Sequence, residues 1–350
     1  MKVLFILKRR PDYNGEIHSH IGVSTGLFNS ATFTSNMLAD AGIDSVLEIA
    51  IDNNCIDRLV TKHKPTYVII EALWVVPEKF DILQKLHPKV TWIIRLHSEI
   101  PFIAGEGMAM NWIGRYLDYK NIILAANAPR MLKEVKTYLD IKYGRQNNEK
   151  RIIYLPNFYP NVHTKKIFNK GKKHIDISCF GAIRPLKNQL LQAIAAVKFA
   201  DSINKKLRFH INVGRLEMNG SPVFHNLKAL FENLKDKGHE LVTHEWTPRE
   251  EFLELCATMD IGLQVSFTET FNIVGADLIS QGVPLVGSNE IPWSCSFYNA
   301  DPVDSDDIYR KLYATYYSSL INVTINQIGL NSYTENVREH WLWYFNENNE

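Results

Sequence analysis

Two carboxylates in the second half of the chain have a spacing that could serve a hydroxyl-rich ligand. Glu269 and Asp277 lie eight positions apart in the segment SFTETFNIVGADLISQGVPLVGS, which follows one apolar run and leads into another. A carboxylate accepts hydrogen bonds, so one of them could hold vicinal hydroxyls of a sugar and the other those of a ribose. Taken alone, the pair is better explained as a helix-capping glutamate and a surface aspartate.

Two basic residues further upstream could hold an anion. In the segment CFGAIRPLKN, Gly181 follows an apolar run, and Arg184 and Lys187 come just before a helical pattern. A glycine permits a tight turn, an arginine can grip phosphate with two hydrogen bonds, and a lysine adds a point charge. The arrangement suits a diphosphate, and two solvated loop bases are an equally good explanation.

A helix start in the carboxylate segment adds backbone donors. The pattern predicts a buried strand over Met259–Val265, a loop over Ser266–Thr270 and then a helix. The first turn of a helix leaves its N–H groups without intrahelical partners. We therefore expect the N–H groups of Phe271, Asn272 and Ile273 to be available to sugar hydroxyls or phosphate.

The elements that must position these residues alternate along the chain. Short apolar runs alternate with amphipathic stretches, which is typical of parallel sheets flanked by helices. Strands are predicted at 3–6, 45–51, 67–71, 90–96, 121–125 and 151–154, and again at 175–180, 207–213, 241–245, 261–265 and 284–287. The clearest helix covers 188–201, with Asn188 as its N-cap and Leu190, Ile194 and Val197 on one apolar face.

Length and texture predict two domains. A chain of 350 residues can bury two cores, and the basic stretch NVHTKKIFNKGKKH, from Asn161 to His174, is interpreted as a linker. The predicted domains are 1–165 and 174–330, with a helix over 331–350 packing back on the first. The fold class is α/β, with two Rossmann-like, doubly wound domains facing across a cleft. Ligands of such sheets bind at the carboxyl ends of the strands.

The motifs, taken in order, resemble a known family. Gly181, Arg184, Lys187 and Asn188 form G-x-x-R-x-x-K-N, and the two acids follow in S-F-x-E-x-F-N and its helix. The chain resembles the retaining family-4 glycosyltransferases of the GT-B fold, well over the second domain and loosely over the first. "LPN" at Leu155 and "HEWTPREEFLELCATMDIGLQVS" add to the resemblance, and Asp277 departs from it because the family has glutamate there. The wording of "VIIEALWVVPEKF" and "RLHSEIPF" resembles enzymes encoded by large tailed phages.

This resemblance implies a role for each candidate residue. Arg184 and Lys187 would hold the donor diphosphate, Glu269 the donor sugar and Asp277 the ribose. Backbone groups near the donor would come from Gly181, Phe271, Asn272 and Ile273. The base would lie near Gly214, Arg215 and Trp246. From the first domain, the segment Ser24-Thr25-Gly26-Leu27 would approach the donor, and His97 would reach the reacting centre. A lone histidine after a strand is otherwise often structural.

Other chemistries find less support in the sequence. There is no GxGxxG and no GxxxxGK[ST], which disfavours dinucleotide and P-loop enzymes. Asp304-Ser305-Asp306 has the DxD spacing of a metal site but no strand directly before it, and His18 and His20 have no carboxylate or cysteine pattern beside them. We expect a metal-independent, retaining transfer from a nucleotide sugar, with a UDP-sugar favoured and no prosthetic group.

Charge and composition leave the acceptor open. The net charge is +1, so only local clusters could engage a polyanion: Lys8, Arg9 and Arg10, residues 62–64, Lys150 and Arg151, and the lysines of 165–173. The hypothesis for the acceptor is 5-hydroxymethylcytosine in double-stranded DNA. The alternatives are a surface glycan or lipid-linked acceptor, or a non-catalytic module that binds sugar nucleotide or DNA.

The sequence also predicts a cytoplasmic protein. The apolar run of MKVLFILKRR is too short for a signal peptide, and no stretch approaches the ~20 apolar residues of a membrane span. The four cysteines lie far apart without CxxC spacing, which suits reduced thiols. If the chain is phage-encoded, the compartment is the host cytoplasm.

Overall fold

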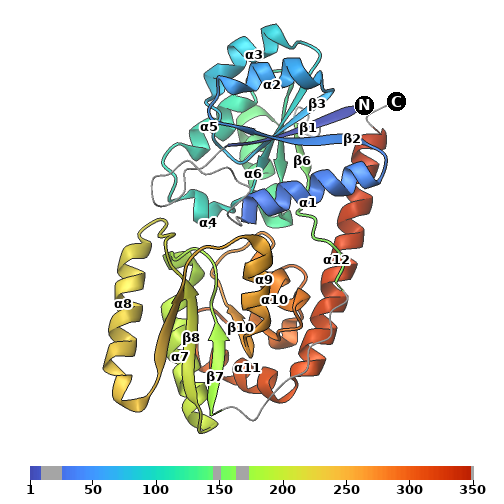
Figure 1. The fold of residues 1–350 in the computed structure, drawn as a ribbon. Helices are drawn as coiled ribbons and strands as arrows, with labels where there is room; N and C mark the ends of the chain where they lie inside the picture. Colours follow the sequence, from blue (N-terminus) through green and yellow to red (C-terminus); the bar gives the residue numbers. More distant parts are fainter. Residues whose placement is uncertain (9–25, 145–150, 163–172, 348–350) are drawn as a thin grey trace. The chain divides into compact units, whose positions relative to one another are not determined.

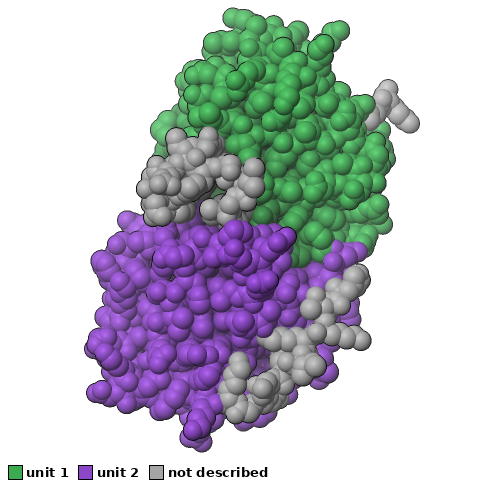
Figure 2. Space-filling model, in the orientation of Figure 1, with its two compact units in different colours: residues 1–20, 25–160, 334–350 green, residues 21–24, 161–333 purple. Residues whose placement is uncertain are grey.

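The computed structural model describes residues 1–8, 26–144, 151–162 and 173–347. The chain forms two compact units (Figure 2): unit 1 comprises residues 1–20, 25–160 and 334–350, and unit 2 comprises 21–24 and 161–333. The acceptor and donor roles predicted for the two domains stay predictions. Several candidate residues lie outside the described part: Arg9, Arg10, His18, His20, Lys150, Lys165, Lys166, Lys170 and Lys172.

Unit 1 is built on a six-stranded parallel sheet with helices on its faces (Figure 1). The strands are β1 (Lys2–Lys8), β2 (Asp44–Ala50), β3 (Tyr67–Glu71), β4 (Thr91–Leu96), β5 (Ile122–Ala126) and β6 (Ile152–Tyr154), in the order β2-β1-β3-β4-β5-β6. The helices are α1 (Gly26–Asp40), α2 (Cys55–His63), η1 (Pro77–Lys79), α3 (Phe80–Leu86), α4 (Ile100–Ile103), α5 (Ala109–Tyr116) and α6 (Pro129–Tyr143). All residues of β3 are buried, because helices cover both faces of a parallel sheet.

Unit 2 repeats the plan with five parallel strands. They are β7 (His174–Ser178), β8 (Lys206–Asn212), β9 (Glu240–His244), β10 (Ile261–Gln264) and β11 (Leu285–Gly287), in the order β11-β10-β7-β8-β9. The helices are η3 (Pro185–Lys187), α7 (Gln189–Ser202), α8 (Gly220–Asn233), η4 (Lys235–Lys237), α9 (Arg249–Ala257), α10 (Ile273–Ser280), η5 (Ser296–Tyr298), α11 (Ser305–Tyr317) and α12 (Ser319–Glu347). The predicted α/β class with two parallel, doubly wound sheets is confirmed.

The strand order fixes where each sheet can bind a ligand. In unit 2 the chain runs from β7 outward through β8 to β9, and then returns to the other side of β7 with β10 and β11. The loops after β7 and β10 therefore leave the sheet in opposite directions, which opens a crevice at the carboxyl ends of these strands. In unit 1 the same switch lies between β1 and β3. The two candidate motifs of unit 2 lie in the loops that follow β7 and β10.

Helix α12 is longer than predicted, because it begins at Ser319 rather than near 331. Its C-terminal part belongs to unit 1, where the Trp341 ring lies 6.1 Å from that of Phe5 and its indole N–H donates to the carbonyl of Pro156 at 2.9 Å. Among the helices in the described part of the chain, none is long and apolar enough to cross a membrane.

Two local predictions for α7 hold only in part. Asn188 occupies the N-cap position as predicted, but it has a left-handed conformation, with φ +58°, and its side chain makes no capping hydrogen bond. Its amide instead donates to the carbonyls of Val265 and Pro302, at 3.2 and 2.7 Å. Ile194 is 44% exposed, because the buried face of α7 is lined by smaller residues such as Ala193 and Ala196.

The close approach of α12 to a neighbouring carbonyl gives a stability prediction. A Cβ at Gly329 would lie 2.4 Å from the carbonyl oxygen of Trp293. Gly329→Ala would gain about 1 kcal/mol of helix propensity, but the backbone clash should outweigh this gain and lower the free energy of unfolding by about 1–3 kcal/mol. The urea midpoint measures the change. Gly107→Ala is the control, because a Cβ there meets no heavy atom within 4 Å. A midpoint at or above wild type for Gly329→Ala would contradict the clash.

Candidate functional site

The loop after β7 turns sharply at Gly181. This residue has φ +112°, a conformation that favours glycine, and its N–H donates to the side-chain oxygen of Asn212 at 3.0 Å. The chain then continues through Arg184 into η3 and α7. Arg184 and Lys187, the two predicted basic residues, therefore lie in the loop that follows the carboxyl end of β7.

Lys187 and Glu269 form an ion pair between the two loops at the switch point. The ammonium group contacts a carboxylate oxygen of Glu269, and the side chains are only 12% and 8% exposed. The N–H of Phe267 donates to the carbonyl of Leu186 at 3.0 Å, which ties the loop after β10 to η3. The backbone thus holds the two charges together, so the structure unites two residues that stand 82 positions apart in the sequence.

Arg184 and Arg215 share one carboxylate. Glu217 accepts from Arg184 at 3.2 Å with one oxygen and from Arg215 at 2.7 Å with the other. Backbone hydrogen bonds join the two loops, from Ile183 N–H to the Arg215 carbonyl and from Glu217 N–H to the Ile183 carbonyl, both 3.0 Å. The loops after β7 and β8 therefore present two guanidinium groups as one unit.

The region predicted to hold the base contains a cation–aromatic contact. The Arg215 guanidinium carbon lies 5.2 Å from the centre of the Trp246 ring. Gly214 has φ +84°, and a Cβ there would lie 3.3 Å from a carboxylate oxygen of Glu245. The backbone after β8 thus runs close to the segment after β9. The planar guanidinium of Arg215 and the ring of Trp246 are both groups on which a nucleotide base can stack.

The start of α10 is held by a capping asparagine. Asn272 has φ +62°, its side-chain oxygen accepts from the N–H of Gly275 at 2.7 Å, and its amide donates to Gln264 at 3.0 Å. Phe271 is 2% exposed, and its carbonyl accepts from the indole of Trp293 at 2.8 Å. Ile273 is the first helical residue. The predicted backbone donors therefore lie on a rigid helix start, although the Asn272 side chain already uses one N–H of the first turn.

Asp277 is buried, and it does not pair with Lys187, the partner of Glu269. It is 2% exposed, and its carboxylate contacts Arg249, at the start of α9, at 2.7 Å. Glu269 stands in the loop before α10 rather than on it, so helical spacing does not relate the two acids. Each acid has its own basic partner. A buried carboxylate without a cation would be strongly disfavoured, which explains the need for Arg249.

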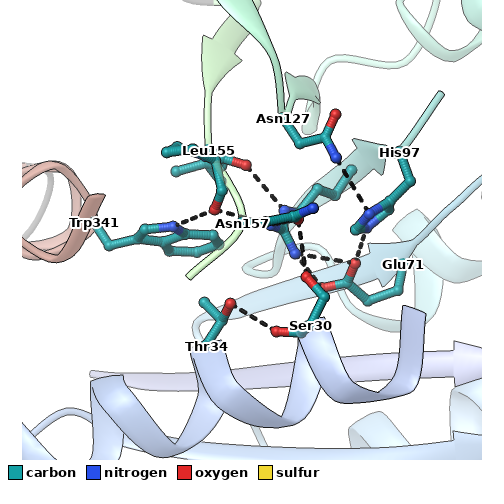
Figure 3. A network of polar contacts seen from close by, with 10 residues as sticks. Ser30, Thr34, Glu71, His97, Asn127, Leu155, Asn157 and Trp341 are labelled. Atoms are coloured by element: carbon teal, nitrogen blue, oxygen red, sulfur yellow. Dashed lines mark hydrogen bonds and ion pairs between the residues drawn. The ribbon is translucent and has the colours of Figure 1, made fainter. Parts of the chain in front are cut away.

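In unit 1 a buried polar network surrounds Arg95, and Figure 3 labels its partners Glu71 and Asn157. Arg95 and Glu71 are both 0% exposed, and their side chains lie 3.0 Å apart. The guanidinium also donates to the carbonyls of Leu155 and Pro156 and to the side-chain oxygen of Asn157, at 3.0, 2.9 and 2.6 Å. The predicted "LPN" stretch is therefore fixed to the ends of β3 and β4.

His97 extends this network toward the carboxyl end of β4. One ring nitrogen, Nε2, contacts Glu71, and the other, Nδ1, lies 3.4 Å from the amide of Asn127 (Figure 3). Because carboxylates accept, Nε2 carries the proton toward Glu71 and Nδ1 is left as the acceptor. Gly26, the other candidate of unit 1, is the first residue of α1, and Ser30 on the same helix donates to Asn157 at 2.8 Å.

Burial and charge set the protonation of this pair. Burial is the largest influence on the pKa of His97 and lowers it, against the opposing effect of Glu71. Burial alone would raise the pKa of Glu71, but Arg95 and His97 more than offset this effect and hold the pKa below its usual range. At neutral pH the network therefore contains an ionised Glu71, a cationic Arg95 and a neutral His97.

Sequence reasoning missed three charged partners, Glu217, Arg249 and Glu71. Only Glu71 had a usable signal, because a charged residue that ends a fully apolar strand needs a buried counter-ion. Asp304 has a structural role: it caps α11 by accepting from the N–H groups of Asp306 and Asp307, at 2.8 and 3.1 Å.

Comparisons with known proteins define the fold class. No protein-family model and no curated protein sequence matches the chain. Among solved structures, the trehalose-6-phosphate synthase OtsA is 12% identical with a TM-score of 0.68, over 99% of this chain and 98% of that one. A structure from E. coli with bound UDP-2-fluoro glucose is 12% identical with a TM-score of 0.67, over the same shares of both chains. S. aureus TarM, solved with fondaparinux, α-GlcNAc-glycerol and UDP, is 14% identical with a TM-score of 0.57, over 80% of this chain and 55% of that one. At these identities the likeness shows the fold, which is GT-B.

The neutral state of His97 gives a pH prediction. The fold lowers the pKa of His97 from its ordinary 6.5, so the unfolded chain binds more protons below that pH. The contribution of His97 to stability is therefore present above about pH 6.5 and lost as the pH falls, with a slope of up to about 1.4 kcal/mol per pH unit. Urea unfolding of wild type and His97→Gln between pH 7.5 and 5.5 should show a flatter slope in the variant.

Glu71 also makes stability rise with pH, but it acts at lower pH than His97. Its lowered pKa contributes stability above about pH 4.5, which is lost in more acidic solution.

The control for His97→Gln is His225→Gln, a substitution at an exposed histidine on α8. This control should leave the slope of unfolding free energy against pH unchanged. Equal slopes for wild type and His97→Gln would mean that His97 is not held neutral.

Proposed function

We propose that the chain is a retaining glycosyltransferase that moves a sugar from a nucleoside diphosphate sugar, with a UDP-sugar favoured, to a hydroxyl acceptor. The observation that carries the proposal is the Lys187–Glu269 pair at the switch point of unit 2. One loop there supplies cations for a diphosphate, and the other supplies a carboxylate for sugar hydroxyls. Among the neighbours in fold, the E. coli structure holds UDP-2-fluoro glucose, and trehalose-6-phosphate synthase is described as transferring with retention.

In the proposed donor complex, the diphosphate replaces carboxylates as the partner of the cations. Arg184 and Lys187 face Glu217 and Glu269, so these cations are already held in place. Positive charge that is fixed before the reaction stabilises the charge that develops on the leaving diphosphate, with little reorganisation. Gly181 lets the backbone come close to the donor phosphates.

The remaining candidates recognise the nucleotide and the acceptor side. Asp277, fixed by Arg249, binds the ribose, and the base stacks near Arg215 and Trp246 above the turn at Gly214. The start of α10, from Phe271 to Ile273, binds sugar hydroxyls or phosphate. In unit 1, His97 acts at the reacting centre, and the start of α1 at Gly26 approaches the donor.

The bond changes follow from retention. The bond between the anomeric carbon and the diphosphate oxygen breaks, and the acceptor oxygen bonds to the same carbon from the same face. The departing diphosphate is then the base nearest to the attacking hydroxyl, and it takes the proton. Arg184 and Lys187 perform the charge neutralisation that a metal provides elsewhere, so the proposed reaction needs no metal ion.

The acceptor proposed from the sequence is 5-hydroxymethylcytosine in double-stranded DNA, as in an enzyme of phage origin acting in the host cytoplasm. Lys8 ends β1 at an exposed position, which supports a basic rim. Glu48 weakens that rim, because it lies 2.6 Å from both Lys62 and His63. A glycan or lipid-linked acceptor and a non-catalytic binding module are the alternatives that the experiments below separate.

Glu269→Gln should slow transfer by roughly 10–150-fold, which corresponds to the 1.5–3 kcal/mol of one hydrogen bond to a charged group. The measurement is sugar release from a panel of UDP-sugars, with and without acceptor, each in the presence and in the absence of EDTA. Asp306→Asn is the matched control, because it removes a carboxylate from an exposed pair with Lys198 in the same unit. Near-normal turnover in Glu269→Gln would remove the central claim.

The same assay tests the other parts of the proposal. Wild-type activity that EDTA abolishes and Mn²⁺ restores, together with loss in Asp306→Asn, would make Asp304-Ser305-Asp306 a metal site. A wild type that neither transfers nor hydrolyses any donor, yet binds UDP, would make the chain a binding module.

Replacing Lys8, Arg9 and Arg10 together by Ala should weaken binding to hydroxymethylated duplex DNA. Each lost phosphate contact should reduce the slope of log affinity against log salt by about 0.9. The measurement is a binding titration at two salt concentrations. Lys62→Ala is the control, because Glu48 already neutralises this lysine. No affinity of the wild type at low salt, and no sugar on hydroxymethylated DNA from any donor, would reject DNA and favour a glycan.

A further inference from the structure

Glu217 lies at the candidate diphosphate site but has no role in the proposed transfer itself. It belongs to the loop between β8 and α8, and its carboxylate bridges guanidinium groups from two different loops. One oxygen lies 3.2 Å from Arg184, and the other lies 2.7 Å from both Nε and Nη2 of Arg215. Two guanidinium groups bind a phosphate in the same way, through hydrogen bonds to two of its oxygens. Glu217 therefore occupies a position that suits an anionic ligand.

The backbone fixes Glu217 against the loop that follows β7. Its N–H donates to the carbonyl of Ile183 at 3.0 Å, and a Cβ on Gly220 would overlap the same carbonyl oxygen. Met218 and Asn219, which lie between them, both have a left-handed backbone, with φ +45° and +68°. This conformation is unfavourable for residues other than glycine, and it persists where the surrounding structure fixes it. The fold of unit 2 therefore imposes the position of Glu217.

Exposure distinguishes this cluster from the structural ion pair of unit 1. The side chains of Arg184, Glu217 and Arg215 are 19%, 19% and 14% exposed. Those of Arg95 and Glu71 are both 0% exposed. A fully buried pair can change partners only by leaving a bare charge in the interior, which is costly. The partly exposed cluster of unit 2 can instead pass its cations to an anion that arrives from solvent.

A carboxylate in this position opposes an incoming anion. Like charges that share a site repel each other, so a phosphate and the Glu217 carboxylate cannot both lie between the same guanidinium groups without a cost. Glu269, the other carboxylate of the site, pairs with Lys187 and has a role of its own toward the sugar hydroxyls. Glu217 has no such role. It is therefore the anion that must give way when a diphosphate binds.

We infer that Glu217 is a built-in competitor of the donor diphosphate, and that Arg215 binds phosphate alongside Arg184. The phosphate replaces the Glu217 carboxylate between the two guanidinium groups, and the carboxylate turns toward solvent. The Trp246 ring, 5.2 Å from the guanidinium carbon of Arg215, keeps that cation in place during the exchange. Breaking the two ion pairs is subtracted from the binding free energy, so Glu217 lowers the affinity for phosphate. The inference rests on the proposed function, because it concerns the same donor site.

The first test measures the affinities for UDP and for uridine by calorimetry. Glu217→Gln keeps the size of the side chain and removes its charge, so UDP should bind about 5–30-fold more tightly, as expected for two partly exposed ion pairs. The affinity for uridine, which has no phosphate, should not change. Glu232→Gln is the matched control, because it removes the same charge from an exposed pair with Lys235 in the same unit. A ratio of UDP to uridine affinity that does not rise in Glu217→Gln overturns the inference.

Inorganic pyrophosphate separates this inference from the proposed function. It should also bind more tightly to Glu217→Gln than to wild type. A wild type that binds no nucleoside diphosphate, with a gain for pyrophosphate in the variant, would reject the glycosyltransferase and keep the anion site. A wild type that transfers sugar, with no gain for UDP or pyrophosphate in the variant, would reject the competitor and keep the enzyme.

A double variant tests the role of Arg215. Arg215→Gln should weaken the binding of UDP and of pyrophosphate. In this background Glu217→Gln should give a smaller gain in affinity than in wild type, because one of its two ion pairs is already missing. An equal gain in both backgrounds would mean that Glu217 does not act through Arg215, and would remove Arg215 from the phosphate site.

Discussion

A single buried guanidinium holds the candidate site of unit 1 together. Arg95 is 0% exposed, and it bonds Glu71 at the end of β3 and the backbone of residues 155 and 156, while its guanidinium lies 5.2 Å from the centre of the Trp341 ring. Breaking such a pair by removing one partner typically costs about 3–5 kcal/mol, because the other charge stays buried. The orientation of His97, the path of the "LPN" segment and the docking of the end of α12 all depend on this charge.

The candidate diphosphate site of unit 2 differs from this network, because its charged residues lie in loops that follow strands. Lys187 pairs with Glu269, and Arg184 pairs with Glu217, both in partly accessible positions. A cation with an internal partner is held in one place, and an anionic ligand can still take over that partner's role. The same pairing would therefore keep the loops in place and still allow the proposed diphosphate to bind.

Helix α12 shows how a sheet edge shapes the surface. The edge strand β11 needs hydrogen-bond partners, and Asn322 supplies both of them to Leu285. The buried face of the first half of α12 therefore carries Asn322 and Asn326 beside the apolar Val323 and Leu330. Gly329 lets the helix come close enough to Trp293 for the contact to form.

The sequence by itself determined the elements and the loops in which chemistry could occur. Apolar runs predict buried parallel strands because both faces of such strands are covered, and turns at Gly181 and the helix start at Ile273 have local signals. Only the tertiary structure decided which charges meet. Lys187 and Glu269 are brought together by strand order, Asp277 pairs with Arg249 across two helices, and Ile194 faces outward although its spacing predicts burial. Periodicity reports which residues share a face of one element, whereas partners are set by contacts between elements that are distant in the sequence.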